Sequence, residues 1–207
     1  MNLLIARISG RLTGTPHLAH WLDALAVWPG SLVIAPGDGP LSVAARATSK
    51  EMGLHAVAAQ RLTLMAMDQF AVALAAVRPS PAIAQTEEEL RGAIAARRIA
   101  IWAPARMGIT ATDIPATSEI SSDSLAAWLA GKLGAAHLLL IEDIDPPSPV
   151  STAWLAQRDY VDARFPDFAA LANCPIWIAG PGALLGAEDL LTQSRLPGAR
   201  VTAMRGA

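Results

Sequence analysis

Short apolar runs alternate along this chain with longer stretches in which apolar residues recur at helical spacing. The apolar runs predict six β-strands, at 3–8, 31–35, 99–103, 137–142, 175–179 and 200–204. The strand sequences are apolar throughout, as in LLIARI and HLLLIE, and do not alternate with polar residues. Such strands, separated by helices, are typical of a mainly parallel sheet that is covered on both faces. The pattern therefore predicts an α/β fold.

The stretches between these strands predict seven helices, at 16–27, 41–52, 56–77, 86–97, 122–134, 165–172 and 186–193. The helix at 122–134 carries one apolar stripe, formed by Leu125, Trp128, Leu129 and Leu133. The helix at 56–77 is apolar nearly all round, which indicates core or a subunit interface. Asp68 interrupts it, either as a cap for a neighbouring helix or as a partner of Arg61. The segment DPPSPVS (145–151) is the best candidate for a linker or a truncated loop.

Composition supports one large domain, or one domain with a small lobe, within 207 residues. A hydrophobic content of 53% is ample for a core, and disorder is excluded. The net charge of −2 and the pI near 6.1 give no basic surface for nucleic acid or for an acidic membrane. The mean hydropathy of +0.36 is high, which favours a buried oligomer interface.

Cysteine and histidine usage narrows the chemistry further. The one cysteine, Cys174, cannot form an internal disulfide and fits a reducing cytoplasm, where we expect it to be a buried structural thiol. Four scattered histidines give no zinc-ligand spacing, so no metal site is expected from protein ligands. We expect no signal peptide and no membrane span, because the amino-terminal apolar stretch is short and no uncharged apolar run reaches about 18 residues.

Ligands of parallel α/β sheets bind outside the carboxyl ends of the strands, so the loops that follow the strands are the candidate sites. SGR (9–11) and PGDGP (36–40) both place glycines where a backbone can approach an anion. The alternative for each is an ordinary tight turn between a strand and a helix. IEDIDPP (141–147) follows the fourth of the predicted strands and adds acids to the same edge.

The stretch SSDS (121–124) has two readings. Ser121 or Ser122 can cap the following helix, and Asp123 suits the positive end of its dipole. If Asp123 instead faces the cleft with the glycine loops, its carboxylate can orient cationic side chains or a metal. The acid-rich stretch DYVDARFPDF (159–168) is either a solvated loop or an edge that faces the substrate.

In their order along the chain, three motifs resemble those of the amino-acid kinase family, which includes the acetylglutamate, aspartate and uridylate kinases. RISGR (7–11) is similar to the family's strand followed by K-x-G-G-S, and PGDGPLSVAAR (36–46) is similar to its P-G-G-G-P loop. SSDSLAAWLAGKLGA (121–135) is similar to its T-S-D-S-x-A-x-x-L-A-x-x-L-G-A stretch. AAQRLTLMAMDQF, PARM and DYVDARFP resemble the small branch of [5-(aminomethyl)furan-3-yl]methyl phosphate kinases of methanofuran biosynthesis.

The resemblance implies a three-layer αβα sandwich in a single domain, 1–207, with an acceptor-side half at 1–120 and a shortened nucleotide-side half at 121–207. It also implies a homodimer, or a hetero-oligomer, formed through the helix at 56–77. The activity implied is transfer of the γ-phosphoryl group of ATP, bound with Mg²⁺, to a small anionic acceptor that carries a phosphate or carboxylate.

Roles for individual residues follow from the same resemblance. Arg7 and Asp123 would be catalytic. The phosphates of the nucleotide would be bound by Ser9, Gly10, Arg11 and Asp143. The acceptor would be bound by Gly37, Asp38, Gly39, Arg46 and Ser122.

The chain also departs from the family pattern. Arg7 stands where the family has its first catalytic lysine, Asp38 stands inside the second glycine loop, and IEDIDPPSPVS lacks the glycine of T-D-V-D-G-V. Neither Lys50 nor Lys132 falls in a catalytic position of the family. Three hypotheses remain. The first is an active kinase in which arginines replace lysines, and the second is an inactive kinase-like subunit that binds a ligand or a partner enzyme. The third is an αβα fold unrelated to the family.

Overall fold

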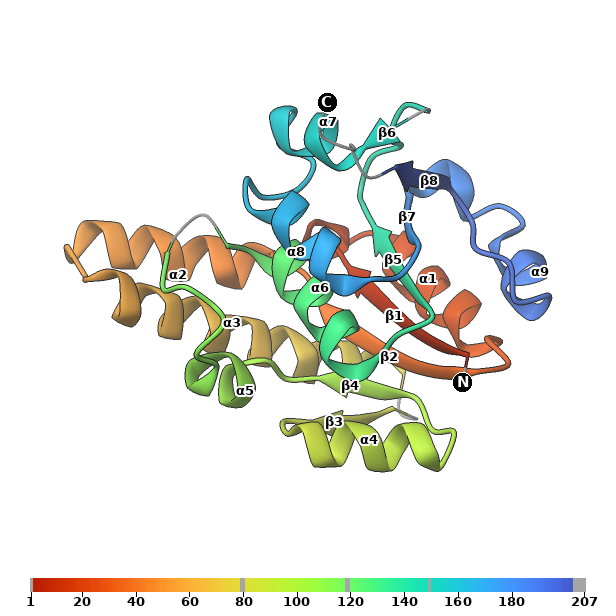
Figure 1. Cartoon of the computed structure of the whole chain (residues 1–207), viewed down its shortest axis with the longest axis horizontal. Helices are drawn as coiled ribbons and strands as arrows, with labels where there is room; N and C mark the ends of the chain where they lie inside the picture. The colour runs from red at the N-terminus through yellow and green to blue at the C-terminus, as the bar shows by residue number, and fades with distance from the viewer. Residues whose placement is uncertain (1, 79–80, 118–119, 149, 203–207) are drawn as a thin grey trace.

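The computed structural model describes residues 2–78, 81–117, 120–148 and 150–202, and it is built on one eight-stranded sheet (Figure 1). Across the sheet the strands follow the order β3-β4-β2-β1-β5-β7-β8-β6. Their bounds are β1 Leu3–Ile8, β2 Ser31–Pro36, β3 Ala82–Ala84, β4 Ala100–Trp102, β5 His137–Ile141, β6 Val150–Ser151, β7 Ile176–Ala179 and β8 Ala199–Thr202. Every pairing is parallel except that of β7 with β8, which confirms the predicted mainly parallel sheet.

Nine α-helices and two short 3₁₀ helices connect the strands in the described residues. The bounds are α1 Pro16–Ala26, α2 Pro40–Glu51, α3 Ala56–Val77, α4 Glu87–Ala95, α5 Ala105–Thr110, α6 Ser122–Leu133, α7 Thr152–Gln157, α8 Phe165–Ala172 and α9 Ala187–Thr192, with η1 at Gly10–Leu12 and η2 at Pro181–Ala183.

The central strand β1 divides the core into two layers. Successive side chains of a strand point to opposite faces. Leu3 and Ile5 therefore pack in one cluster, with α4, α6 and α8, whereas Leu4, Ala6 and Ile8 pack in the other, with α1 and α9. The molecule is thus a three-layer αβα sandwich, as Figure 1 shows from one side of the sheet.

Helix α6 is the most enclosed helix, because the sheet lies on one side of it and α8 covers the other. The predicted apolar stripe of Leu125, Trp128, Leu129 and Leu133 is buried, and so is every other residue from 122 to 130. Gly134 ends the helix in a left-handed conformation, with φ of 66°, which glycine adopts without a Cβ penalty. A helix with so little solvent exposure holds its amino terminus in a fixed place.

The predicted elements agree with the structure in the long segments, whereas four short elements were missed. Helix α3 has the predicted bounds, but β3, β6, α5 and α7 were not predicted. The interpretation of 145–151 as a linker is wrong at its end, because Val150–Ser151 form β6 and pair with β8. The predicted strand at 200–204 begins one residue earlier and is described to Thr202; residues 203 and 204 lie outside the described residues. Strands of two or three residues and helices of six residues are too short to show a clear periodicity.

Two smaller predictions are settled by contacts. Asp68 caps a neighbouring helix, since its Oδ1 accepts the Ala105 amide at 2.9 Å at the start of α5. Cys174 was predicted to be buried and is only half-buried, but this burial raises the pKa of its thiol to about 11. The thiol therefore stays protonated near neutral pH, as a structural cysteine does.

Candidate functional site

The two predicted glycine turns touch each other at the carboxyl ends of β1 and β2. A Cβ on Gly10 would lie 2.5 Å from the Cα of Gly39, and a Cβ on Gly37 would lie 2.3 Å from the carbonyl oxygen of Ile8. Only glycine allows two backbones to pass so closely. The Ser9 amide donates to the Ile141 carbonyl at 2.9 Å, which ties the first turn to the end of β5. The ends of three neighbouring strands therefore form one edge of the site.

Asp38 joins the second turn to the amino terminus of α6. Its amide donates to the Ser122 hydroxyl at 3.1 Å, and its Oδ2 accepts the Ser122 amide at 3.3 Å. Its Oδ1 accepts a hydrogen bond from Arg46 Nη1 at 2.9 Å. Asp38 thus has a cationic partner and fixes the guanidinium of Arg46 at the wall of the site.

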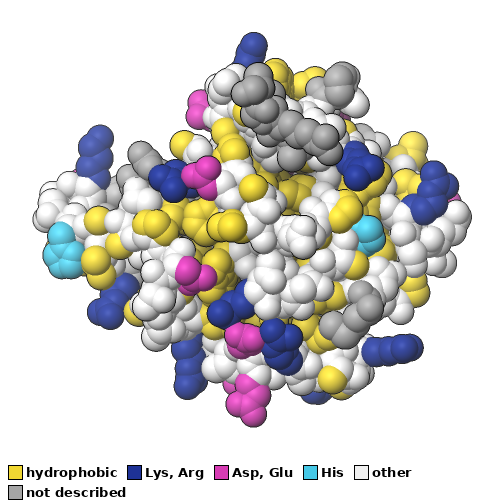
Figure 2. All heavy atoms as spheres, viewed as in Figure 1, with side chains coloured by type: hydrophobic (Ala, Val, Ile, Leu, Met, Phe, Trp, Pro, Cys, Tyr) yellow, Lys and Arg dark blue, Asp and Glu magenta, His cyan; other side chains and the backbone are white. Residues whose placement is uncertain are grey.

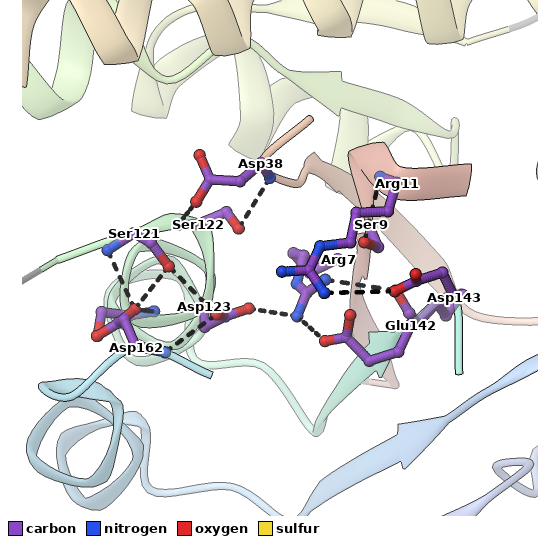
Figure 3. A network of polar contacts seen from close by, with 12 residues as sticks. Arg7, Ser9, Arg11, Asp38, Ser121, Ser122, Asp123, Glu142, Asp143 and Asp162 are labelled. Carbon is purple, nitrogen blue, oxygen red and sulfur yellow. Dashed lines mark hydrogen bonds and ion pairs between the residues drawn. The ribbon is translucent and has the colours of Figure 1, made fainter. Parts of the chain in front are cut away.

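Arg7 reaches inward from the end of β1 and is only 2% exposed. Its Nη2 forms ion pairs with Asp123 of α6 and with Glu142, which directly follows β5, and Figure 3 shows the guanidinium between the two carboxylates. Its Nη1 also donates to the Ile141 carbonyl at 3.4 Å. Burial lowers the pKa of Arg7, but the two acids outweigh that effect and hold the pKa above its ordinary value. Arg7 is therefore a permanent buried cation.

Asp123 is buried in the same network. Its Oδ2 accepts hydrogen bonds from the Ser121 hydroxyl at 3.2 Å and from the Asp162 amide at 3.3 Å. Desolvation raises the pKa of Asp123 well above its usual range, Arg7 opposes the rise, and the neighbouring Glu142 and Asp162 add to it. One arginine cannot fully compensate two buried carboxylates, so a raised pKa for one of them is physically sound.

Asp162 is a site residue that the sequence analysis did not identify. Its carboxylate accepts the amides of Ser121 at 3.1 Å and Ser124 at 3.0 Å, as well as the Ser124 hydroxyl at 2.6 Å (Figure 3). The expectation that a serine side chain caps α6 is thus wrong, because Ser121 makes no side-chain cap bond and Asp162 takes that part. The only signal in the sequence was the acid-rich stretch 159–168, considered as an edge that faces the substrate. Nothing in the sequence shows that it meets α6.

The acids after β5 have three different positions. Glu142 points inward to Arg7, and Asp143 lies at the rim, where its Oδ1 is 3.9 Å from Nη1 of the exposed Arg11. Asp145 turns away, and its carboxylate accepts the Gly182 amide at 2.9 and 3.1 Å. The loop after β5 is therefore fastened to the loop after β7.

Two cavities adjoin at this place. The smaller, of about 250 Å³, is lined by the site residues and carries five acids against three arginines. The larger, of about 490 Å³, lies between α2 and α3 and is mainly apolar. Arg46 and Ser121 line both cavities, so the mouth of the apolar cavity opens beside the polar site.

Every predicted site residue lies in this region of the described structure. Those that line the smaller cavity are Arg7, Ser9, Arg11, Asp38, Arg46, Ser122 and Asp123. Gly10, Gly37 and Gly39 form the touching turns, and Asp143 stands at the rim. Within the described residues no group of three or more His, Cys, Asp or Glu side chains is placed to hold a metal ion. Among the same residues no helix is both long and apolar enough to cross a membrane.

The fold is that of the amino-acid kinases. The uridylate kinase from Archaeoglobus fulgidus superposes with a TM-score of 0.70 at 13% identity, over 98% of this chain and all of that one. The UMP kinase from Ureaplasma parvum gives 0.66 at 14% identity, over 97% and 99%. An isopentenyl phosphate kinase gives 0.62 at 14% identity, over 96% and 100%. No protein-family model matches the sequence, and no curated protein does.

Proposed function

We propose that this protein is a small-molecule phosphotransferase, which moves the γ-phosphoryl group of ATP to an anionic acceptor. One observation carries the proposal: two touching glycine turns, the amino terminus of α6 and an apolar cavity with Arg46 at its mouth meet at the carboxyl ends of β1 and β2. Phosphoryl transfer depends mostly on positioning and on charge neutralisation, for which amides and guanidinium groups suffice. The similarity of fold to kinases whose names specify uridylate and isopentenyl phosphate supports it.

In this proposal one side of the cleft binds the nucleotide and the other side binds the acceptor. Ser9, Gly10 and Arg11, which come from the half at 1–120, would lie on the nucleotide side together with Asp143, which comes from the half at 121–207. Gly37, Asp38, Gly39, Arg46 and Ser122 lie on the acceptor side, in or beside the half at 1–120. Arg7 and Asp123 stand between the two sides. Both halves contribute to one sheet, since β1 pairs with both β2 and β5.

The nucleotide would bring Mg²⁺ with it. Mg²⁺ is commonly held by one or two carboxylates together with substrate phosphates, and a cage built from protein ligands alone is uncommon. The donor set of the smaller cavity, with several carboxylates but no preformed ligand cluster among the described residues, fits that mode of binding. Asp123 would contribute its carboxylate, and Mg²⁺ would neutralise charge on the phosphates.

The apolar cavity indicates what kind of acceptor fits. Its floor is formed by Leu54, Leu64, Met67, Ile120 and Leu125, and Arg46 is 40% exposed at its mouth. An acceptor with an anionic head at Arg46 and a small apolar or aromatic body in the cavity would bury both parts suitably. A furan-methyl phosphate, as in methanofuran-type or tetrahydromethanopterin-type C1 cofactor biosynthesis, is an acceptor of this kind.

The test measures turnover of MgATP with a series of acceptors: alkyl phosphates from methyl phosphate to hexyl phosphate, and a furan-methyl phosphate. Release of ADP is the quantity measured. We expect kcat/KM to rise with the size of the apolar body, by about fourfold for each buried CH₂. Arg46→Gln should raise the acceptor KM at least tenfold and leave the KM of ATP nearly unchanged. Absence of ADP release with every acceptor, together with absence of nucleotide binding, would reject the proposal.

A matched pair of variants tests the cavity itself. Ala59 lines the cavity, so Ala59→Phe should fill it and remove the advantage of the longer acceptors. Ala47 is exposed on α2 and does not line the cavity, so Ala47→Phe should leave the series unchanged. Equal effects of the two variants would show that the cavity does not hold the acceptor.

The second candidate function is an inactive kinase-like subunit that binds a ligand or a partner enzyme. The pairing of Arg7 with two internal carboxylates favours it, because this cation stands where the family has a catalytic lysine and already has partners. Acceptor binding without any phosphoryl transfer, in a chain that co-purifies with a pathway enzyme, would favour this function over the first.

A further inference from the structure

Glu142 has one side-chain partner among the described residues, and that partner is Arg7. Asp123, the other acid on Arg7, also accepts hydrogen bonds from Ser121 and Asp162. The two acids therefore differ: Asp123 is held by residues around the start of α6, whereas the carboxylate of Glu142 has Arg7 as its one polar partner in the described part of the chain. Figure 3 shows Glu142 approaching the guanidinium from the side of β5, opposite Asp123.

The contact lies where an anionic ligand would act. Arg7 and Glu142 both line the smaller cavity, and Nε of Arg7 is buried without a hydrogen-bond partner in the described part of the chain. A guanidinium presents five N–H donors in a planar fork, which suits two oxygens of a phosphate as well as those of a carboxylate. The carboxylate of Glu142 thus pairs with a guanidinium nitrogen that is equally suited to a phosphate oxygen.

We propose that Glu142 is an internal competitor for Arg7, which phosphate groups of the nucleotide must displace before they bind. This inference rests on the proposed nucleotide site and adds its regulation. In the arrangement described here, the cation at the end of β1 is neutralised from within the chain. The apparent affinity for a ligand falls in proportion to the fraction of molecules that can bind it, so the pairing weakens nucleotide binding.

The test compares nucleotide affinity in variants of the full chain by calorimetric titration. Glu142→Gln removes the negative charge but keeps the shape of the side chain, and Arg7 retains Asp123 as its partner. We expect MgATP to bind Glu142→Gln at least tenfold more tightly than the unaltered chain. Adenosine, which has no phosphate to place on Arg7, should bind both proteins equally. A purely structural role of Glu142 would not separate the two ligands.

Asp159→Asn is the matched control. Asp159 lines the same cavity, so its substitution removes one negative charge from the same wall, and no described contact joins it to Arg7. Its φ of 57° is a conformation that asparagine tolerates well. We expect less than a twofold change in MgATP affinity. Glu142→Asp, which keeps the charge but shortens the side chain by one CH₂, should give a gain smaller than that of Glu142→Gln and serves if the latter fails to fold.

The possible outcomes separate this inference from the proposed function. If MgATP binds only after Glu142→Gln, the competition is supported and the unaltered chain is not a kinase. If the unaltered chain turns over MgATP and Glu142→Gln binds it no more tightly, the competition is overturned and the kinase function stands. Equal gains in Glu142→Gln and Asp159→Asn also overturn it, because they would show a general charge effect. No MgATP binding in any folded variant contradicts both.

Discussion

Arg7 carries one positive charge, and two buried carboxylates, Asp123 and Glu142, lie against it. A buried group that lacks full compensation tends to take up a proton, because burial disfavours its charged form. At the residue scale the network thus combines a permanent cation with an acid that titrates unusually high. That combination affects the stability of the fold as well as its chemistry.

The stability of the protein should therefore depend on pH through Asp123. Desolvation raises the pKa of Asp123 to about 7, against about 4 in the unfolded chain, so the folded state holds a proton that the unfolded state has lost. The protonated acid contributes stability fully below about pH 4, and this contribution is lost as the pH rises toward 7. We expect a loss of about 1–3 kcal/mol in the free energy of unfolding.

Urea unfolding from pH 4 to pH 7.5 measures this dependence. Asp123→Asn, which cannot ionise, should flatten it across that range, and Asp167→Asn, at an exposed acid on α8, should leave it as in the unaltered chain. Equal slopes in the unaltered chain and in Asp123→Asn would contradict the assignment.

At the scale of elements, the close contact of the turns after β1 and β2 holds the site together. Gly10→Ala places a Cβ 2.5 Å from backbone atoms of the opposite turn, which have no rotamer to relieve the clash. We expect a loss of about 1–3 kcal/mol in the free energy of unfolding, the usual cost of overpacking, together with weaker phosphate binding as the turns separate.

Gly92→Ala is the control for Gly10→Ala, because it makes the same substitution elsewhere in the chain. Urea unfolding measures the stability of both variants. Gly92 lies inside α4, where a Cβ would meet nothing within 4 Å. Alanine is the better helix former, so this variant should gain about 0.5–1 kcal/mol. A neutral effect of Gly10→Ala would mean that the turns are not in close contact.

What the sequence could predict also differs between elements. The long helices α3 and α6 and the buried strands β1 and β2 have periodic or continuous apolar patterns, so their places and the parallel sheet followed from pattern alone. The three motifs pointed to the residues of the cleft, because two of them follow the neighbouring strands β1 and β2 and the third begins helix α6. Asp162 escaped prediction because its role depends on a contact across 38 and 41 residues with Ser124 and Ser121, which no local pattern records. The inward turn of Glu142, beside the outward Asp143, is likewise fixed by tertiary packing.

At the scale of the whole molecule, apolar side chains gather at the surface of one region. Leu41 and Val43 on α2, Met52 directly after α2, and Val57, Met65 and Val72 on α3 are all more than 40% exposed. In Figure 1 these two helices form one end of the molecule, and in Figure 2 hydrophobic side chains interrupt the polar surface there. A concentration of exposed apolar residues on a globular protein is typical of an interaction surface.

We therefore predict that the chain forms a homodimer through α3. Met65 and Val72, which are 53% and 57% exposed, lie two helical turns apart on the same face, and burying the exposed part of each against a second copy would contribute about 1–1.5 kcal/mol. The double variant Met65→Glu, Val72→Glu would place two like charges from each copy in an apolar interface, at a cost that exceeds this gain. Light scattering coupled to size-exclusion chromatography should show a dimer for the unaltered chain and a monomer for the variant.

Leu185→Glu is the control. Leu185 is 94% exposed but follows η2, far from α3 in the sequence, so its substitution should leave the dimer intact. A monomeric unaltered chain, or a double variant that remains dimeric, would show that the apolar surface of α3 serves another purpose.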